Sequence, residues 1–273
     1  MIRVFARRTK WTPMDDLAFY DGPPLFNMPE MPVRVNCVFS WDKDRAIRLG
    51  KEWAKRFRDV KVGGPAFGDP GGEFVPERFV KRGVIFTSHG CPKRCPWCYA
   101  WKREGNIREL KIQEGWIVQD NNLLACSRSH IERVFEMLKK QPLSASFPGG
   151  LDLDYLSDWH IELFKGLRKN HRLGILFVAF DTEKSLEKLS MARDLLGDFH
   201  INQRFAYALI GFDGDTIEQA ESRLERIYDD ERGFLPFAML FDKNSKSHEW
   251  KKLQRKWARP AAYRGRKNFK SEL

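Results

Sequence analysis

The sequence predicts an α/β protein built on a parallel sheet, and three observations carry this prediction. Apolar residues make up 42% and aromatic residues 13% of the 273 residues, which is enough for a large core. From residue 83 onward, apolar runs typical of buried strands alternate with amphipathic segments typical of helices, in about six units. Turn-forming glycine, proline and polar residues separate these segments. Such alternation favours right-handed crossovers, in an open or partial barrel or in a doubly wound sheet.

Residues 1–80 differ from the rest of the chain and are rich in proline and glycine. Extended runs at 33–41 and 59–64 flank a helix expected at 44–58, which predicts a strand–helix–strand unit with irregular surroundings. We therefore expect a small N-terminal α/β extension ahead of the main unit.

Residues 81–242 hold the main unit. Strands are expected at 83–88, 143–150, 174–180, 205–212 and 235–241, and helices at 129–140, 158–169, 182–196 and 216–228. The segment 106–120 is expected to form a hairpin that turns at Glu114-Gly115.

Five strands run into segments that carry glycine or polar side chains: SHGC, PGGLD, FDT, GFDGD and FDK. Active sites on parallel sheets lie at the carboxyl ends of the strands. Any one of these segments suits an ordinary turn, but the five together predict a ligand-binding face.

Three of the five cysteines lie in HGCPKRCPWCYA, residues 89–100. Cys91, Cys95 and Cys98 form a C-x3-C-x2-C motif directly after the first strand of the main unit. Three thiolates can hold three irons of a four-iron cluster and leave the fourth iron open to a small ligand. Structural zinc needs a fourth protein ligand, which His89 could supply. The spacing favours an iron–sulfur cluster, with zinc and unligated thiols as alternatives.

The motif resembles the signature of the radical S-adenosylmethionine (radical SAM) superfamily, which lies after the first strand of a partial (β/α)6 barrel. Trp97 matches the aromatic residue that often precedes the third cysteine of that signature. SFPGGLD, residues 146–152, resembles the family's glycine-glycine-acid element. This likeness implies that Gly149, Gly150 and Asp152 contact the amino group of SAM, with Asp152 one residue beyond the usual glutamate.

Further segments extend the resemblance over roughly residues 83–241. ALIGFDGDT, residues 208–216, is similar to a fifth-strand segment that lies against adenosine, which implies contacts from Ile210 and Phe212. VQDNNLL, residues 118–124, resembles the second-strand end of the cobalamin-binding branch and implies roles for Asn121 and Asn122. Asp181, at the end of the fourth strand, could bind a ribose or the substrate, or support the following helix.

The resemblance implies a partial (β/α)6 TIM-like barrel that holds one [4Fe-4S] cluster on Cys91, Cys95 and Cys98. The amino and carboxylate groups of SAM would chelate the open iron. A one-electron reductant such as a flavodoxin-like or ferredoxin-like protein would drive cleavage of SAM to methionine and a 5′-deoxyadenosyl radical, which abstracts hydrogen from a substrate.

The likeness is greatest to the cobalamin-binding branch, but the N-terminal segment is short for a cobalamin domain. No histidine precedes His89, so none in this segment could lie below a cobalt. We expect a degenerate remnant of such a domain, without cobalamin. Cys126, just past the second strand, is the candidate catalytic residue, as a hydrogen donor or covalent acceptor; a small buried side chain is the alternative.

The basic residues concentrate at the C-terminal end. The net charge is +11, and residues 243–273, a predicted basic helix and tail, hold eleven Lys and Arg against two Asp and Glu. Cations alternate there with aromatic residues, as in proteins that bind nucleic acid. The alternative is an amphipathic helix packed through Trp250, Leu253 and Trp257.

Two classes of function remain at this stage. The opening MIRVFARRTKWTP lacks the apolar stretch of a secretory signal, and no apolar run is long enough for a membrane span. We expect a cytoplasmic protein with no membrane partner. It is either a radical SAM enzyme, whose substrate could be nucleic acid, or a non-catalytic, zinc-stapled nucleic-acid-binding protein. The β/α units and the PGGLD and LIGFDGD segments favour the enzyme.

Overall fold

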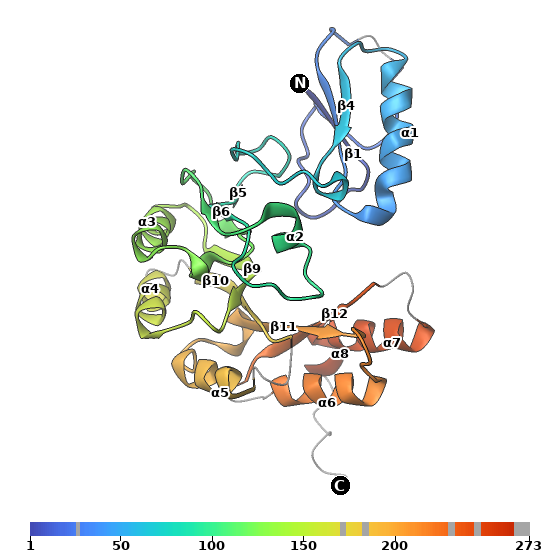
Figure 1. Cartoon of the computed structure of the whole chain (residues 1–273). Coiled ribbons are helices and arrows are strands. Elements are labelled where there is room, and N and C mark those ends of the chain that lie inside the picture. Colours follow the sequence, from blue (N-terminus) through green and yellow to red (C-terminus); the bar gives the residue numbers. More distant parts are fainter. Residues whose placement is uncertain (26–27, 170–172, 182–185, 229–232, 243–246, 265–273) are drawn as a thin grey trace.

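The computed structural model describes residues 1–25, 28–169, 173–181, 186–228, 233–242 and 247–264. Figure 1 shows an N-terminal unit with α1 beside its strands, and a larger unit that carries the remaining helices. Buried apolar side chains form two separate clusters, one within residues 2–57 and one within residues 85–263. Each unit therefore has its own core.

The N-terminal unit is a four-stranded parallel sheet in the order β2-β1-β3-β4. Its strands are β1 (Ile2–Phe5), β2 (Ala18–Phe19), β3 (Val33–Asn36) and β4 (Val60–Gly63), and its helix is α1 (Lys43–Ala54). The predicted strand–helix–strand unit is β3, α1 and β4. The sequence prediction missed β1 and β2, although Ile2 and Val4 are fully buried against Trp53 of α1 in the same cluster.

The main unit is a six-stranded sheet in which every strand pair is parallel. Its strands are β5 (Val84–Ile85), β8 (Ile117–Val118), β9 (Ala145–Asp152), β10 (Leu173–Ala179), β11 (Arg204–Ile210) and β12 (Leu235–Leu240). They lie side by side in chain order, so the described strands show no reversal of the kind that marks a doubly wound sheet. The predicted parallel α/β architecture is confirmed.

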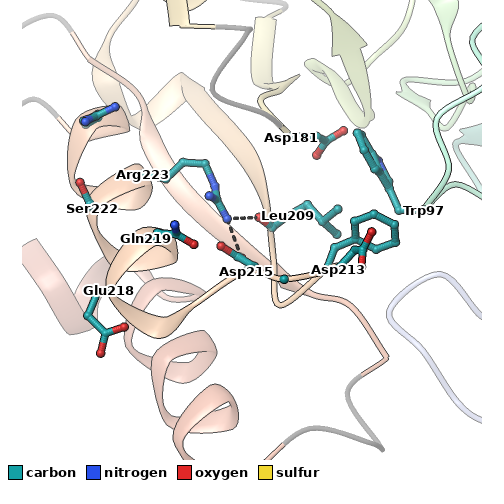
Figure 2. Close-up of a pocket in the computed structure, with 12 residues that line it drawn as sticks. Trp97, Asp181, Leu209, Asp213, Asp215, Glu218, Gln219, Ser222 and Arg223 are labelled. Carbon is teal, nitrogen blue, oxygen red and sulfur yellow. Dashed lines mark hydrogen bonds and ion pairs between the residues drawn. The ribbon is translucent and has the colours of Figure 1, made fainter.

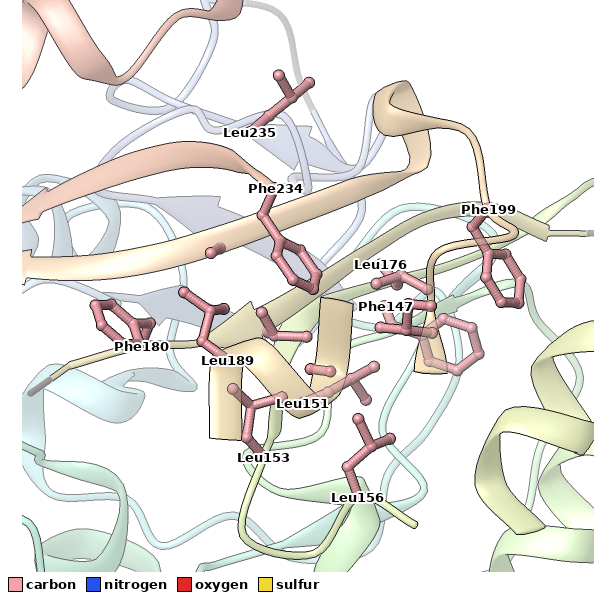
Figure 3. Packing of buried hydrophobic residues seen from close by; sticks show 14 of the residues in the cluster. Phe147, Leu151, Leu153, Leu156, Leu176, Phe180, Leu189, Phe199, Phe234 and Leu235 are labelled. Carbon is pink, nitrogen blue, oxygen red and sulfur yellow. The ribbon is translucent and has the colours of Figure 1, made fainter. Parts of the chain in front are cut away.

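Helices cover one face of this sheet. They are α3 (Arg128–Lys139), α4 (Asp158–Lys169), α5 (Leu186–Leu195), α6 (Ile217–Ile227), α7 (His248–Trp257) and α8 (Pro260–Arg264). Alternate strand residues such as Leu176 and Ala206 are fully buried in this core. Figure 3 shows Leu151 of β9, Leu176 of β10 and Leu189 of α5 among the buried side chains of this core. The first residues of the helix predicted at 182–196 lie outside the described part of the chain.

The prediction of a hairpin that turns at Glu114-Gly115 is wrong. A short antiparallel pair joins β6 (Ser88–His89) to β7 (Arg108–Glu109), and β8 instead pairs in parallel with β5 and β9. Gly115 lies where the chain passes close to β5, because a Cβ atom there would be 2.4 Å from Ile85 Cγ2. This glycine marks close packing rather than a turn between two strands.

The C-terminal helices belong to the main core. Leu253 and Trp257 of α7 and Tyr263 of α8 are buried, and Trp250 packs against the same cluster. This confirms the predicted amphipathic packing of the helix. The residues 243–246 and 265–273 lie outside the described part of the chain, so nucleic-acid binding by the tail stays a prediction. No helix among the described residues is long and apolar enough to span a membrane.

Candidate functional site

The three motif cysteines lie in a loop that is closed at its base. The loop leaves β6, continues into the short helix α2 (Ala100–Glu104) and returns through β7. Cys91 N donates to Gly105 O at 3.1 Å, and Cys98 N donates to Cys95 O at 3.1 Å. All three thiols are free and partly exposed. The sheet edge thus presents the cysteines on a compact, anchored loop.

Glu104 anchors this loop from within. Its side chain, only 5% exposed, accepts hydrogen bonds from Gly90 N at 2.9 Å and from Asn121 Nδ2, and it lies 3.3 Å from His89 Nδ1. Burial alone would raise the pKa of Glu104, but its bonds with His89, Arg103 and Gly90 outweigh burial and lower the pKa to about 2. Asn121 therefore supports the loop through Glu104.

Glu104→Gln is expected to destabilise the fold by about 2–3 kcal/mol at neutral pH. Because the folded pKa lies below the usual value of 4.5, this stabilisation is present above pH 4.5 and is lost as pH falls toward 2. Urea unfolding of both proteins should give a difference in unfolding free energy that shrinks as pH falls from 7 to 3. Glu136→Gln, which removes an exposed ion pair to Lys139, is the control and should change stability little. A Glu104→Gln difference independent of pH would contradict this account.

A hydrogen-bonded network joins three segments that the sequence singled out. Asn122, which follows β8, donates from Nδ2 to Asp152 Oδ2 at 3.0 Å and lies 3.4 Å from Cys91 Sγ. Lys93, inside the cysteine loop, places its Nζ 3.0 Å from Asp152 Oδ1 and 2.5 Å from Asp154 Oδ2. Asn122 Oδ1 is buried and has no partner among the described residues. Sequence reasoning missed Lys93, whose only signal was its place between two motif cysteines.

The two glycines before Asp152 allow close approach of backbone to backbone. A Cβ atom on Gly149 would lie 2.2 Å from Asp120 O, so a side chain there would push β9 away from the end of β8. Gly150 has φ +93°, a conformation that favours glycine, and its open side meets the ring of Tyr207 at 3.6 Å. Gly149 thus serves packing, and Gly150 permits a backbone conformation that would be strained for a residue with a side chain.

A cavity of about 730 Å³ lies at the carboxyl end of β11 and along α6. Figure 2 shows Trp97 of the cysteine loop on one side and Arg223 of α6 on the other. Trp97 and Phe212 meet edge to face, with ring centroids 5.4 Å apart. Arg223 donates to Asp215 Oδ2 at 2.8 Å and to Leu209 O at 2.9 Å. Trp97, Phe212 and Asp181 all line this cavity.

Ile210, which the resemblance implies to contact adenosine, does not present its side chain to the cavity. It is fully buried in the main core, whereas Leu209 lines the cavity. Successive side chains of a strand point to opposite faces of the sheet. Two neighbouring residues such as Leu209 and Ile210 therefore face the cavity and the helices, respectively. The segment was identified, but its facing residue was not.

Asp181 is a carboxyl group enclosed by the cavity wall and the cysteine loop. Burial raises its pKa to about 6, with a further rise from the charge of Asp152. Hydrogen bonds with Trp97 and the Leu209 backbone, and the charge of Lys93, lower this pKa but do not offset burial. Asp181 therefore changes its protonation near neutral pH.

Asp181→Asn is expected to stabilise the metal-free protein at pH 8 and to have little effect at pH 4. Folding raises the pKa of Asp181 from the usual 3.8 to about 6, so the folded state favours the protonated carboxyl. This stabilisation is present in full below pH 4 and is lost as the pH rises through 6 and the buried group ionises. The shift corresponds to about 2–3 kcal/mol. Thermal unfolding from pH 4 to pH 8 would measure it. Parallel curves for the two proteins would show that folding does not raise the pKa of this carboxyl.

Cys126 lies apart from the cavity. Burial raises the pKa of its thiol to about 12, and the charges of Asp120 and Glu109 act in the same direction, against a hydrogen bond with Ser88. Asp120 is itself buried and accepts bonds from Thr87 N at 2.6 Å and Ser88 Oγ at 2.8 Å. The thiol stays protonated, and it is not among the residues that line the cavity.

The face of the sheet opposite the helices carries aromatic rings that sequence reasoning did not single out. We call this set the aromatic floor: Phe177 of β10, Phe205 and Tyr207 of β11, and Phe237 of β12. Phe177 stacks on Phe205 at 4.8 Å and on Tyr207 at 4.4 Å. Leu209 follows Tyr207 on the same face and lines the cavity, so the floor leads into it. The burial pattern of β11, with every second residue only partly buried, is the signal that could have revealed it.

The donor set of the loop suits a cluster bound by thiolates. Burial raises the pKa of Cys95, Lys93 lowers it, and the charges of Cys98, Asp181 and Cys91 raise it, so the three thiols lie within electrostatic reach of one another. No three His, Cys, Asp or Glu side chains of the described residues converge on a single metal ion. A four-iron cluster is wider than one ion and takes its thiolates from around its faces.

Comparison with known proteins adds no relative: no protein-family model matches the sequence, and no curated protein matches it. The functional argument therefore depends on the residues and on their arrangement.

Proposed function

We propose that this protein is a radical SAM enzyme, with a [4Fe-4S] cluster on Cys91, Cys95 and Cys98. The observation that carries the proposal is the network of Cys91, Asn122 and Asp152. These residues come from the cysteine loop, the end of β8 and the end of β9, which lie apart in the sequence. These three segments were each matched to the radical SAM family separately, and here they meet at one edge of the sheet. This arrangement supports the resemblance without relying on the spacing of the cysteines.

We also propose that the main sheet forms a partial (β/α)6 barrel. Six parallel strands in chain order with helices on one face are the arrangement that such a barrel requires. The aromatic floor would then face the barrel interior. Apolar rings there exclude water from the reaction and receive an apolar or aromatic part of the substrate.

The side chains of the edge have distinct proposed roles. The bound cluster and SAM would supply an electron and a carbon-centred radical for hydrogen abstraction. Asp152 binds the amino group of SAM, a role that its ion pair with the Lys93 ammonium supports. Lys93 releases Asp152 when the ligand enters. Trp97 and Phe212 hold the adenosine, Asp181 accepts a hydrogen bond from its ribose, and Gly149 and Gly150 lie beside the amino group as in the family's glycine-glycine-acid element.

Several further expectations belong to this proposal. The cluster needs an electron donor, such as a flavodoxin-like or ferredoxin-like protein. Free thiols suit the reducing cytoplasm. The N-terminal unit acts as a remnant of a cobalamin domain and takes no cobalamin. Nucleic acid is a candidate substrate because the C-terminal residues 243–273 are strongly basic.

A zinc staple is the competing function. His89 would be the fourth ligand; its Nδ1 lies 3.3 Å from Glu104 Oε2, and its ring stacks on Phe86 with centroids 5.4 Å apart. A carboxylate on one ring nitrogen is also usual for a zinc-bound histidine, so the metal content of the protein separates the two functions.

Anaerobic purification followed by measurement of iron, sulfide and zinc tests the proposal. Dithionite and SAM are then added, and 5′-deoxyadenosine is measured. The expected result is about four irons per chain with SAM-dependent cleavage. Stoichiometric zinc, no iron after reconstitution and no cleavage would overturn the proposal in favour of the structural staple.

A further inference from the structure

The N-terminal sheet also has a carboxyl edge, and the chain places cations and aromatic rings along it. The loops that follow β1, β3 and β4 lie next to one another because these strands are neighbours in the sheet. Ligands of open parallel sheets bind outside this edge. The residues concerned, which we call the N-terminal ridge, are Lys10, Trp11, Trp41, Lys43, Phe67 and Lys81.

The loops after β3 and β4 expose aromatic surface. Trp41, in a 3-10 turn at Ser40–Asp42, is 55% exposed and stacks on Phe39 with ring centroids 4.8 Å apart. Phe67, in a 3-10 turn at Pro65–Phe67, is 39% exposed, and Lys43 Nζ lies 5.5 Å from the centre of its ring. A solvent-facing indole that already stacks on one ring is a platform for a further planar ring.

Two lysines distant in the sequence meet over one indole ring. Lys10 Nζ lies 4.4 Å and Lys81 Nζ 5.1 Å from the ring centre of Trp11. The Trp11 carbonyl accepts the Lys81 backbone N–H at 2.7 Å, which fixes the two segments together. Within the described ranges neither lysine forms an ion pair with a carboxylate. Burial and the like charge of Lys81 lower the pKa of Lys10, so an anion bound between them would relieve this repulsion.

The ridge keeps its positive charge because its buried acid is already neutralised. Asp42 accepts two hydrogen bonds from Arg7, at 2.7 and 2.8 Å, which also tie the loop after β1 to the loop that holds Trp41. The Arg7–Asp42 pair thus joins the loop after β1, which carries Lys10 and Trp11, to the loop that carries Trp41.

We propose that the N-terminal ridge binds single-stranded nucleic acid. Lys10, Lys81 and Lys43 bind phosphates, and an unpaired base stacks on Trp41. Cations that follow a backbone and aromatic rings that stack on bases are the two components of such surfaces, and an acidic peptide would make no use of the second. The proposal assigns nucleic acid to a surface other than the tail, and it does not depend on the radical chemistry.

Fluorescence anisotropy of the full chain with a labelled single strand of about 16 nucleotides, without SAM or reductant, tests the ridge. Lys10→Glu and Trp41→Ala are each expected to weaken binding about tenfold, and Trp41→Phe, which keeps a stacking ring, should restore most of the loss. Lys10→Glu should also reduce the slope of log affinity against log salt by about 0.7.

Lys140→Glu makes the same charge change at the end of α3 and is the matched control, with an expected loss below about twofold. Thermal unfolding of each variant shows that the fold is retained. The proposal is overturned if Lys10→Glu and Trp41→Ala weaken binding no more than Lys140→Glu. It is also overturned if Trp41→Phe fails to restore binding, or if a duplex of equal length competes as well as the single strand. Because no cofactor takes part, failure here would leave the proposed enzyme activity untouched.

Discussion

Cys95→Ala is expected to abolish iron binding and SAM cleavage together. Each motif cysteine holds one iron of the proposed cluster, so two thiolates would remain where three are needed. Cys95 is the middle ligand, and its backbone carbonyl also accepts bonds from Cys98 N and, at 2.8 Å, from Trp101 Nε1. Alanine keeps these backbone bonds and removes only the thiol. Iron and sulfide per chain after anaerobic reconstitution, together with 5′-deoxyadenosine formation, would measure the loss.

Two other cysteines provide controls for this experiment. Cys37 is fully buried in the N-terminal core, and Cys126 lies beside Ser88 outside the cavity. Cys37→Ala and Cys126→Ala are expected to keep about four irons per chain. A Cys95→Ala protein that kept both iron and cleavage would end the assignment of the cluster.

Asp152→Asn is expected to weaken SAM binding about tenfold to a hundredfold. The asparagine oxygen can still accept the bond from Asn122, but the negative charge and the bonds that Lys93 and Asp154 N make to Asp152 Oδ1 are lost. What disappears is the charge-assisted bond to the ligand amino group, which is stronger than a neutral one. Calorimetric titration of SAM into the reconstituted protein would measure the change.

Two neighbours distinguish a ligand role of Asp152 from a structural one. Asp154 also pairs with Lys93, but its bonds do not reach Asn122, so Asp154→Asn should change SAM affinity less than about threefold. Lys93→Met removes the ammonium that occupies Asp152 and should not weaken binding. An equal loss in Lys93→Met would show that Asp152 acts by holding the cysteine loop rather than by contacting SAM.

Local patterns in the sequence predicted the parts of the site that depend on residue type and spacing. The C-x3-C-x2-C motif identified the loop, and the glycines of PGGLD identified a segment where the backbone approaches closely, which Gly149 does against Asp120. The alternation of apolar runs and amphipathic helices was enough to predict a parallel sheet, because both periodicities are local.

Other parts of the site depend on which segments pair, and no local pattern contains that information. The β6–β7 pair closes the cysteine loop, yet its short strands gave no periodic signal and a hairpin at Glu114-Gly115 was predicted instead. Several contacts join side chains from separate segments. They are the contact of Glu104 with His89, the ion pair of Lys93 with Asp152, and the approach of Lys10 and Lys81 to the ring of Trp11.

By itself, the sequence determined the α/β class, the parallel strands, the cysteine loop and the segments that end at the ligand edge, since residue type and period are written along the chain. Tertiary structure decided which face of each segment meets the cavity, as in the exchange of Ile210 for Leu209. It also decided the environment of each carboxyl group: Glu104 is held ionised by its donors, whereas burial raises the pKa of Asp181 to about 6. The physical reason is that burial and charge depend on neighbours in space, which only the folded chain brings together.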